Sequence, residues 1–188
     1  MKNQTIKQKE QSAFETLKNE FGYKNAMAAP KMEKIVINVG TGTLIKKDKN
    51  KNDAISDRLA KITGQKAALR GAKQSIASFK IRQGDPIGIV VTMRGKRMNA
   101  FLEKLINVAL PRTKDFRGIS RNAVDNIGNL TIGIKEHTIF PETADEDIKD
   151  VFGMSVTLVS TAKNKKEGLA FFELLGMPFK KEEDKKSK

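Results

Sequence analysis

Four stretches of the chain alternate apolar residues with polar or small ones, which is the pattern of a β-strand with one buried face. Residues 87–94, 130–135 and 154–161 follow this period of two. A β-branched run at residues 32–39 ends at a Gly-Thr-Gly turn and indicates a further strand. We predict that each strand turns one side toward a core and leaves the other side to solvent.

Four other stretches repeat apolar residues with the period of an α-helix. The clearest is the stretch 98–109, which Pro111 ends. Asn164 and Glu167 have the spacing of a capping box before the last helix. The three remaining stripes, each followed by a glycine stop, are Phe14, Leu17 and Phe21 with Gly22; Ile55, Leu59 and Ile62 with Gly64; and Leu169, Phe172 and Leu175 with Gly176.

Alternating strands favour an antiparallel sheet, because such a sheet can be buried on one face and wet on the other. We predict an α+β fold with about five strands, amphipathic helices packed on one face, and the opposite face open for binding. Residues 1–179 are expected to form a single domain, in which residues 5–21 form the first helix. The charged tail 180–188 is expected to be disordered.

The outward positions of these strands are small, polar or basic, which suits the phosphates and riboses of RNA. An ordinary solvated sheet face has the same pattern, so alternation alone leaves both interpretations open. The outward set is Lys34, Val36, Asn38, Gly88, Val90, Thr92, Arg94, Thr131, Lys135, Ser155 and Thr157.

Residues 64–84 contain five cations and no acidic residue. Their apolar positions are scattered, and we predict two short strands here with an exposed loop between them. A run of cations without carboxylates favours contact with a polyanion, although lysine-rich loops also occur simply as solvated surface. The cations are Lys66, Arg70, Lys73, Lys80 and Arg82.

The charge balance indicates a polyanionic partner, because 36 Lys and Arg outnumber 22 Asp and Glu for a formal net charge of +14. Neither a transmembrane run nor an amphipathic membrane anchor is found, so no membrane partner is expected and the location is expected to be cytoplasmic. The absence of cysteine agrees with a reducing compartment. Nucleic acid is the expected partner.

Catalytic and cofactor patterns are missing from the sequence. His137 is the single histidine, and its apolar neighbours indicate packing more than catalysis. The acidic residues 142–150 lack the order of a calcium-binding loop, and Gly40-Thr41-Gly42 lacks the continuation of a phosphate-binding loop. We therefore expect no enzyme activity, no cofactor and no metal.

Several separate motifs, in the same order, resemble those of bacterial large-subunit ribosomal protein five, the family that carries 5S ribosomal RNA. The resemblance runs from about Phe21 to Phe179. Its motifs are EKIVINVG at 33–40, TGQK at 63–66, KIRQGDPIG at 80–88, VTMRG at 91–95, PRTKDFRG at 111–118, IFPE at 139–142, TAK at 161–163 and MPF at 177–179.

This resemblance implies a five-stranded antiparallel sheet with helices on one side, located in the central protuberance of the large ribosomal subunit. Family positions that touch 5S rRNA correspond to Asn38, Gln65 and Thr92, and more loosely to Arg94. We add the cations Lys34 and Lys66 to this predicted 5S site. The implied partners are 5S rRNA, large-subunit rRNA and neighbouring large-subunit proteins, with no homo-oligomer.

The resemblance implies two further contacts. A basic loop reaches the peptidyl-site tRNA in the family and corresponds here to Lys73, Gln74, Ser75, Ser78 and Lys80. Gln74 stands where family members usually carry another basic residue. A bridge to a basic protein in the head of the small subunit is expected at Arg112, Lys114, Asp115, Arg117, Glu142, Asp145 and Glu146.

Two other functions remain as alternatives to a ribosomal structural protein. One is a free-standing basic RNA-binding protein, and the other is an RNA-modifying enzyme. An enzyme needs a cofactor fingerprint or a set of acid, base and nucleophile, and the chain offers only scattered carboxylates and lysines beside His137. Sedimentation with the large ribosomal subunit would separate the ribosomal interpretation from both.

Overall fold

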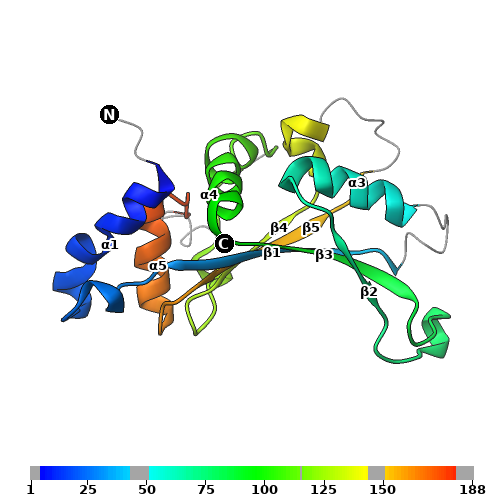
Figure 1. Cartoon of the computed structure of the whole chain (residues 1–188), viewed down its shortest axis with the longest axis horizontal. Coiled ribbons are helices and arrows are strands. Elements are labelled where there is room, and N and C mark those ends of the chain that lie inside the picture. Colours follow the sequence, from blue (N-terminus) through cyan, green and yellow to red (C-terminus); the bar gives the residue numbers. More distant parts are fainter. Residues whose placement is uncertain (1–4, 43–50, 115, 144–150, 181–188) are drawn as a thin grey trace, which may run out of the picture. The chain divides into compact units, whose positions relative to one another are not determined.

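Helices and strands are interleaved along the chain in this computed structural model, which describes residues 5–42, 51–114, 116–143 and 151–180 (Figure 1). No helix within those ranges is long and apolar enough to span a membrane. The helices are α1 (Ile6–Phe21), α3 (Lys51–Thr63), α4 (Gly95–Lys104) and α5 (Lys165–Leu175), and the strands are β1 (Met32–Gly40), β2 (Ala68–Gly71), β3 (Pro86–Met93), β4 (Leu130–Ile134) and β5 (Met154–Ser160).

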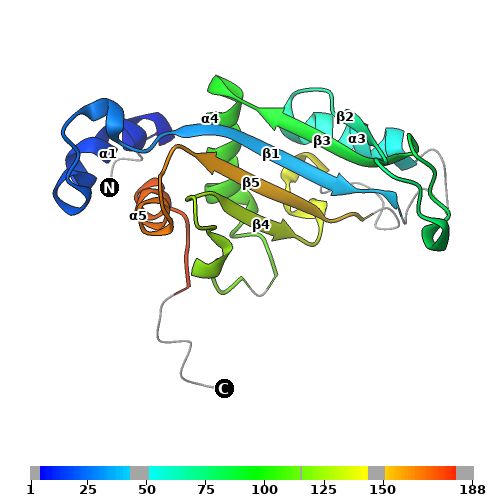
Figure 2. The ribbon, with the colours of Figure 1, turned by 90° about the horizontal axis from the view of Figure 1, so that it is seen from below.

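The strands form one five-stranded sheet in the order β2-β3-β1-β5-β4. Neighbouring strands run antiparallel, as Figure 2 shows for the four longer ones. In the pairing of β2 with β3, Arg70 lies opposite Gly88. The predicted α+β class and the five-stranded antiparallel sheet are confirmed.

Alternation along the strands sets which side chains are buried. In β4, Leu130, Ile132 and Ile134 are buried while Thr131 and Gly133 are exposed. β5 and the second half of β3 follow the same period of two. A shift of one residue would expose every aliphatic side chain of a strand, so this pattern fixes the outward face that the sequence predicts.

The contacts of the chain gather in two compact units. The first unit consists of Met1–Ile35, Arg94–Ile132 and Thr157–Lys188, and the second consists of Val36–Met93 and Gly133–Val156. The division therefore passes through the strands β1, β4 and β5. Each unit has its own helices.

In the first unit, α1 packs against α5 and α4 (Figure 1). The buried residues of α1 are Ile6, Ala13 and Leu17, whereas the predicted Phe14 and Phe21 are only half-buried. The predicted stripe therefore lies partly at the edge of the buried face, because two bulky aromatics outweigh a small alanine in the sequence pattern. Ala13 allows close packing at the buried face of the helix.

The remaining helix predictions differ from the structure mainly at their ends. The long stripe at 98–109 forms α4 followed by a π-helical turn, Leu105–Ala109, before Pro111. In the second unit, α3 packs on β3 with Ile55, Leu59 and Ile62 buried as predicted. Gly64 follows it with a left-handed φ of +72° that strongly favours glycine.

Residues 72–84, which we call the arm, connect β2 with β3. Backbone hydrogen bonds between Ala72 and both Gly84 and Asp85 close the base of the arm, at 3.0 and 2.8 Å. Toward its tip, Ile76 and Ile81 form a single bridge around a short 3-10 turn. The prediction of two strands within residues 64–84 is wrong, because only β2 forms and its partner is β3.

A buried carboxylate caps the start of α5 in the first unit. Glu167 is 3% exposed, and its Oε1 accepts a hydrogen bond from the Tyr23 hydroxyl. Its Oε2 accepts from the backbone N–H of Lys163 at 2.7 Å, and the Asn164 side chain accepts from the Glu167 N–H at 2.9 Å. Burial, and then the neighbouring carboxylate, raises the pKa of Tyr23 far above its usual range, so this hydroxyl remains a donor.

Replacing Tyr23 with Phe is expected to lower the free energy of unfolding by about 1–3 kcal/mol, because it leaves a buried carboxylate oxygen without its donor. Urea denaturation followed by circular dichroism measures the change. Glu167→Gln provides the matched background. In that background, Tyr23→Phe should lower the free energy of unfolding by less than it does in the wild type. Equal losses in the two backgrounds would show that the hydrogen bond contributes nothing.

Candidate nucleic-acid interface

Asn38 and Thr92 lie on the outward side of β1 and β3, both within the second unit. Asn38 is exposed and Thr92 is half-buried, whereas Val91 and Met93 on either side of Thr92 are buried. The Ser155 hydroxyl donates to the Asn38 backbone carbonyl at 3.3 Å, which joins β5 to β1 beside this residue. The outward orientation predicted from alternation is confirmed for both residues.

Gln65 lies beside Thr92 because its side chain is hydrogen-bonded to the end of β3, a contact that cannot be predicted from its position in the sequence. Its side-chain amide donates to the backbone carbonyl of Thr92 at 2.9 Å. The Thr63 hydroxyl lies 2.7 Å from the Leu59 carbonyl and 3.1 Å from the Gln65 carbonyl, which shapes the turn after α3. These contacts hold the Gln65 side chain against the end of β3. Its amide oxygen is left as an acceptor.

The cations of the predicted 5S site divide between the units. Lys66 is exposed in the second unit, directly after Gln65. Arg94 is exposed in the first unit at the start of α4. The six predicted residues therefore form two sets: Asn38, Gln65, Thr92 and Lys66 in the second unit, and Lys34 and Arg94 in the first.

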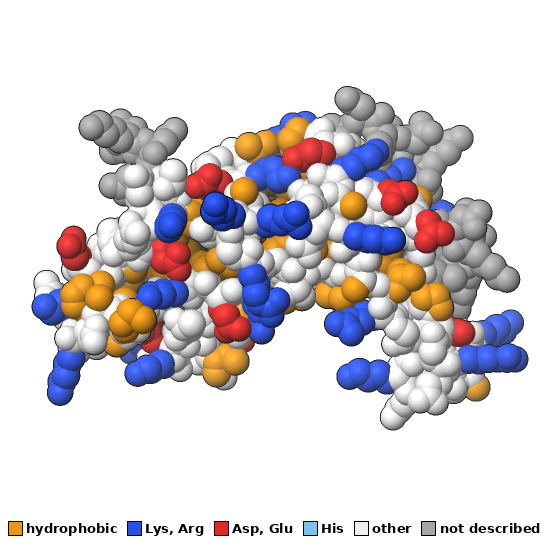
Figure 3. Space-filling model, viewed as in Figure 1, with side chains coloured by type: hydrophobic (Ala, Val, Ile, Leu, Met, Phe, Trp, Pro, Cys, Tyr) orange, Lys and Arg blue, Asp and Glu red, His pale blue; other side chains and the backbone are white. Residues whose placement is uncertain are grey.

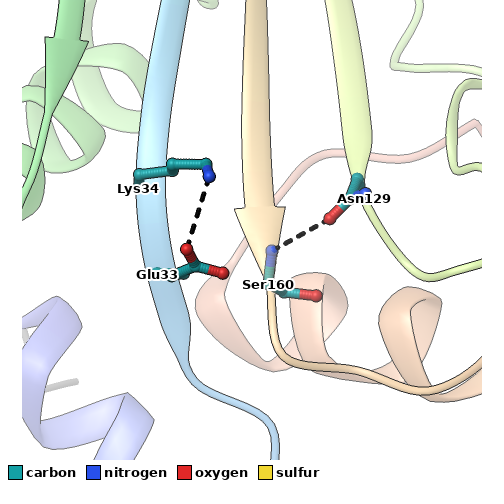
Figure 4. A network of polar contacts seen from close by, with 4 residues as sticks. All are labelled: Glu33, Lys34, Asn129 and Ser160. Carbon is teal, nitrogen blue, oxygen red and sulfur yellow. Dashed lines mark hydrogen bonds and ion pairs between the residues drawn. The ribbon is translucent and has the colours of Figure 1, made fainter.

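Lys34 has a local partner. Its Nζ lies 3.4 Å from Glu33 Oε1, and the two side chains are 31% and 52% exposed (Figure 4). An exposed ion pair of this kind contributes roughly 0–1 kcal/mol, so a phosphate can compete for the lysine at small cost. Figure 4 also shows the Asn129 side chain accepting from the Ser160 N–H at 3.2 Å, which fixes the turn before β4 against the end of β5.

Outward hydroxyls in the first unit are already paired with each other. The hydroxyls of Thr131 and Thr157, on β4 and β5, are 3.1 Å apart, and one of them must donate to the other. The pair therefore keeps one free donor for a phosphate or ribose oxygen. Alternation predicts that both threonines face outward, but it cannot predict this mutual bond.

The arm exposes all five residues of the predicted tRNA loop: Lys73, Gln74, Ser75, Ser78 and Lys80. The Ser75 hydroxyl accepts a hydrogen bond from the Gln83 N–H at 2.9 Å, and Lys80 adopts a left-handed φ of +52°. Figure 3 shows Lys and Arg side chains projecting from the arm at the lower right. The arm also has an apolar tip that the pattern of residues did not predict: Ile76 and Phe79 are 45% and 56% exposed.

The predicted small-subunit bridge is described only in part. Arg112, Lys114 and Arg117 are exposed in the first unit, and Glu142 is exposed in the second. The other predicted bridge residues, Asp115, Asp145 and Glu146, lie outside the described residues.

His137 is buried and lies in the second unit. Its ring stacks on Phe152 with centroids 4.2 Å apart, and its Nδ1 accepts the Phe152 N–H at 3.3 Å. The predicted packing role is confirmed. Within the described ranges, no group of three His, Cys, Asp or Glu residues is placed to hold a metal ion.

Comparison with known proteins identifies the family. The family model for ribosomal protein L5 matches residues 25–82, and a second model, for the C-terminus of the same ribosomal family, matches residues 86–179. The chain belongs to the ribosomal protein L5 family. Large ribosomal subunit protein uL5 of Trichlorobacter lovleyi is 52% identical over 87% of this chain and 91% of its own length. The Dictyoglomus thermophilum protein of that name is 48% identical over 95% of this chain and 99% of its own.

Membership of the L5 family establishes the general role. The chain is a structural, non-enzymatic constituent of the large ribosomal subunit, takes part in translation and is located on the ribosome in the cytoplasm. Binding to ribosomal RNA is typical of the L5 family. The alternative of an RNA-modifying enzyme is therefore excluded.

Proposed function

We propose that the chain binds 5S rRNA and helps attach it in the central protuberance of the large subunit. The observation that carries the proposal is the hydrogen bond from Gln65 to the Thr92 carbonyl, which joins two separate segments on the outward side of β3. Asn38 lies on the outward side of β1, the strand next to β3. Amide and hydroxyl groups held by strand backbones bind ribose and phosphate without large rearrangement.

Lys66 supports the same assignment, since its exposed cation directly follows Gln65. Lys34 and Arg94, the two remaining residues of the predicted 5S site, belong to the first unit. The cations supply affinity through release of counterions, and the amides and hydroxyl orient the RNA. The net charge of +14 fits a partner that carries one negative charge on every nucleotide.

Binding of purified chain to 5S rRNA is expected to weaken steeply with salt, because each phosphate contact releases counterions. Six contacts would lower the affinity about a thousandfold between 50 and 200 mM salt. Gel-shift titrations over that range measure the slope, with a duplex RNA of equal length as the competitor. An affinity that hardly changes with salt would contradict the proposal, as would equal binding to the competitor.

We further propose that the arm contacts peptidyl-site tRNA. Its exposed cations Lys73 and Lys80, together with exposed Phe79, combine charge with an aromatic ring, and such surfaces bind unpaired nucleotides. We also propose a bridge to a basic protein of the small-subunit head. It is supported by the exposed carboxylate of Glu142 in the second unit, which complements a basic partner, whereas Arg112 and Lys114 in the first unit are assigned to it by the resemblance alone.

A further inference from the structure

A cavity of about 520 Å³ opens in the second unit, where β1, β2 and β3 meet the arm. Apolar side chains and glycine backbone line most of it, and polar and cationic side chains complete the lining. The apolar and glycine residues are Val39, Gly40, Gly71, Ala72, Ile76, Ile81, Ile87 and Gly88, and the others are Asn38, Arg70, Lys73 and Gln74.

This space is open because glycines, which have no side chain, stand at several positions of the strands that line it. Gly88 lies opposite Arg70, and a Cβ there would lie 3.7 Å from the Arg70 Cβ. At Gly71 a Cβ would meet the Gly84 carbonyl oxygen at 3.0 Å, so the backbone at the base of the arm can approach this closely only with glycine. At Gly40 an added Cβ would meet nothing within 4 Å.

The lining indicates which kind of ligand fits. It contains the cations Arg70 and Lys73 and the amides Asn38 and Gln74, and it includes no carboxylate. Its volume lies within the roughly 300–1,000 Å³ of sites that enclose small ligands. An unstacked nucleotide has the complementary chemistry, with apolar base faces, hydrogen-bonding base edges and an anionic phosphate.

We propose that this cavity receives one unstacked nucleotide of an RNA bound to the outward face. The base packs against Ile76, Ile81 and Ile87, its edge meets the amides of Asn38 and Gln74, and Arg70 and Lys73 neutralise the phosphate. The inference rests on RNA binding as the function of this face. It adds a base subsite at the arm, which includes neither Gln65 nor Thr92.

The test is a titration of the isotope-labelled full chain with uridine or adenosine 5′-monophosphate, followed by NMR, with ribose 5-phosphate in parallel. The nucleotides are expected to shift the amide signals of Gly40, Gly71 and Gly88 with saturation in the millimolar range, and ribose 5-phosphate is not. Gly40→Leu, which fills the cavity, should weaken binding at least about tenfold. Arg70→Ala should weaken it as well and provides a second variant at an exposed position.

Gly133→Leu is the matched control, because Gly133 is also an exposed strand glycine whose added Cβ would meet nothing within 4 Å. It should bind nucleotides like the wild type. Equal shifts with ribose 5-phosphate, no saturable shift at the three glycines, or equal loss in both leucine variants would overturn the subsite. The gel shift with 5S rRNA tests the proposed function separately, since either experiment can fail alone.

Discussion

Replacing Asn38 with Asp is expected to weaken binding of 5S rRNA by about 2–3 kcal/mol, or roughly 30- to 150-fold. The change keeps the shape of an exposed side chain on β1, so the fold should be unaffected. It removes the two amide N–H donors and places a carboxylate where the proposed contact presents phosphate or ribose oxygens. Loss of a hydrogen bond to a charged group and repulsion between anions then act together.

The control for this variant is Asn126→Asp, which makes the same change of charge at an exposed turn residue in the first unit. It should lower the affinity by less than about threefold, because it changes the net charge of +14 by one without altering a residue of the proposed contact. Gel-shift titrations at fixed ionic strength compare the two variants. Similar losses would show that net charge matters and that Asn38 makes no specific contact.

The outward face was predictable because a strand leaves only two choices for each side chain. Once Ile89, Val91 and Met93 are assigned to the core, Thr92 must face outward, and the structure agrees. Gln65 is different. It lies in a turn, where no period applies, and its place beside Thr92 depends on a side-chain bond between two elements. Only the resemblance to a known family drew attention to it.

The arm shows the opposite case, in which composition predicted chemistry but not conformation. Its cations and its lack of carboxylates are visible in the sequence. Its shape depends on local contacts that follow no period, among them the closure at Ala72, the bridge between Ile76 and Ile81, the bond from the Gln83 N–H to the Ser75 hydroxyl, and a left-handed Lys80. Alternation needs a longer run than this, so the prediction of two strands failed.

The cavity was equally hidden from pattern analysis. Its space arises from glycines on neighbouring strands, and the sequence does not show that Gly40, Gly71 and Gly88 line one hollow. In a strand pattern each of them is read as a weak position or a possible bulge. The strand order β2-β3-β1 and the register that places Arg70 opposite Gly88 bring the three glycines to the lining of one cavity.

Excision of the arm is expected to separate the two proposed RNA contacts. Because Ala72 already pairs with Gly84 and Asp85, residues 73–83 can be replaced by Asn-Gly, which suits a two-residue hairpin turn. The deletion removes Lys73, Lys80 and Phe79 but leaves Asn38, Gln65 and Thr92 in place. The shortened chain also lacks the arm side of the base subsite, so it should bind 5S rRNA at most about tenfold more weakly than wild type and still enter large subunits, as gel shift and sedimentation would show.

Ribosomes that carry the shortened chain should bind peptidyl-site tRNA about tenfold more weakly, since several charged and stacking contacts are lost together. Filter binding of aminoacylated tRNA to purified ribosomes measures this loss. Lys73→Ala is the milder comparison and should cause only part of it, because a single phosphate contact disappears. If the excised chain loses 5S binding and keeps tRNA affinity, the arm belongs to the 5S site and the proposed division between the two contacts is wrong.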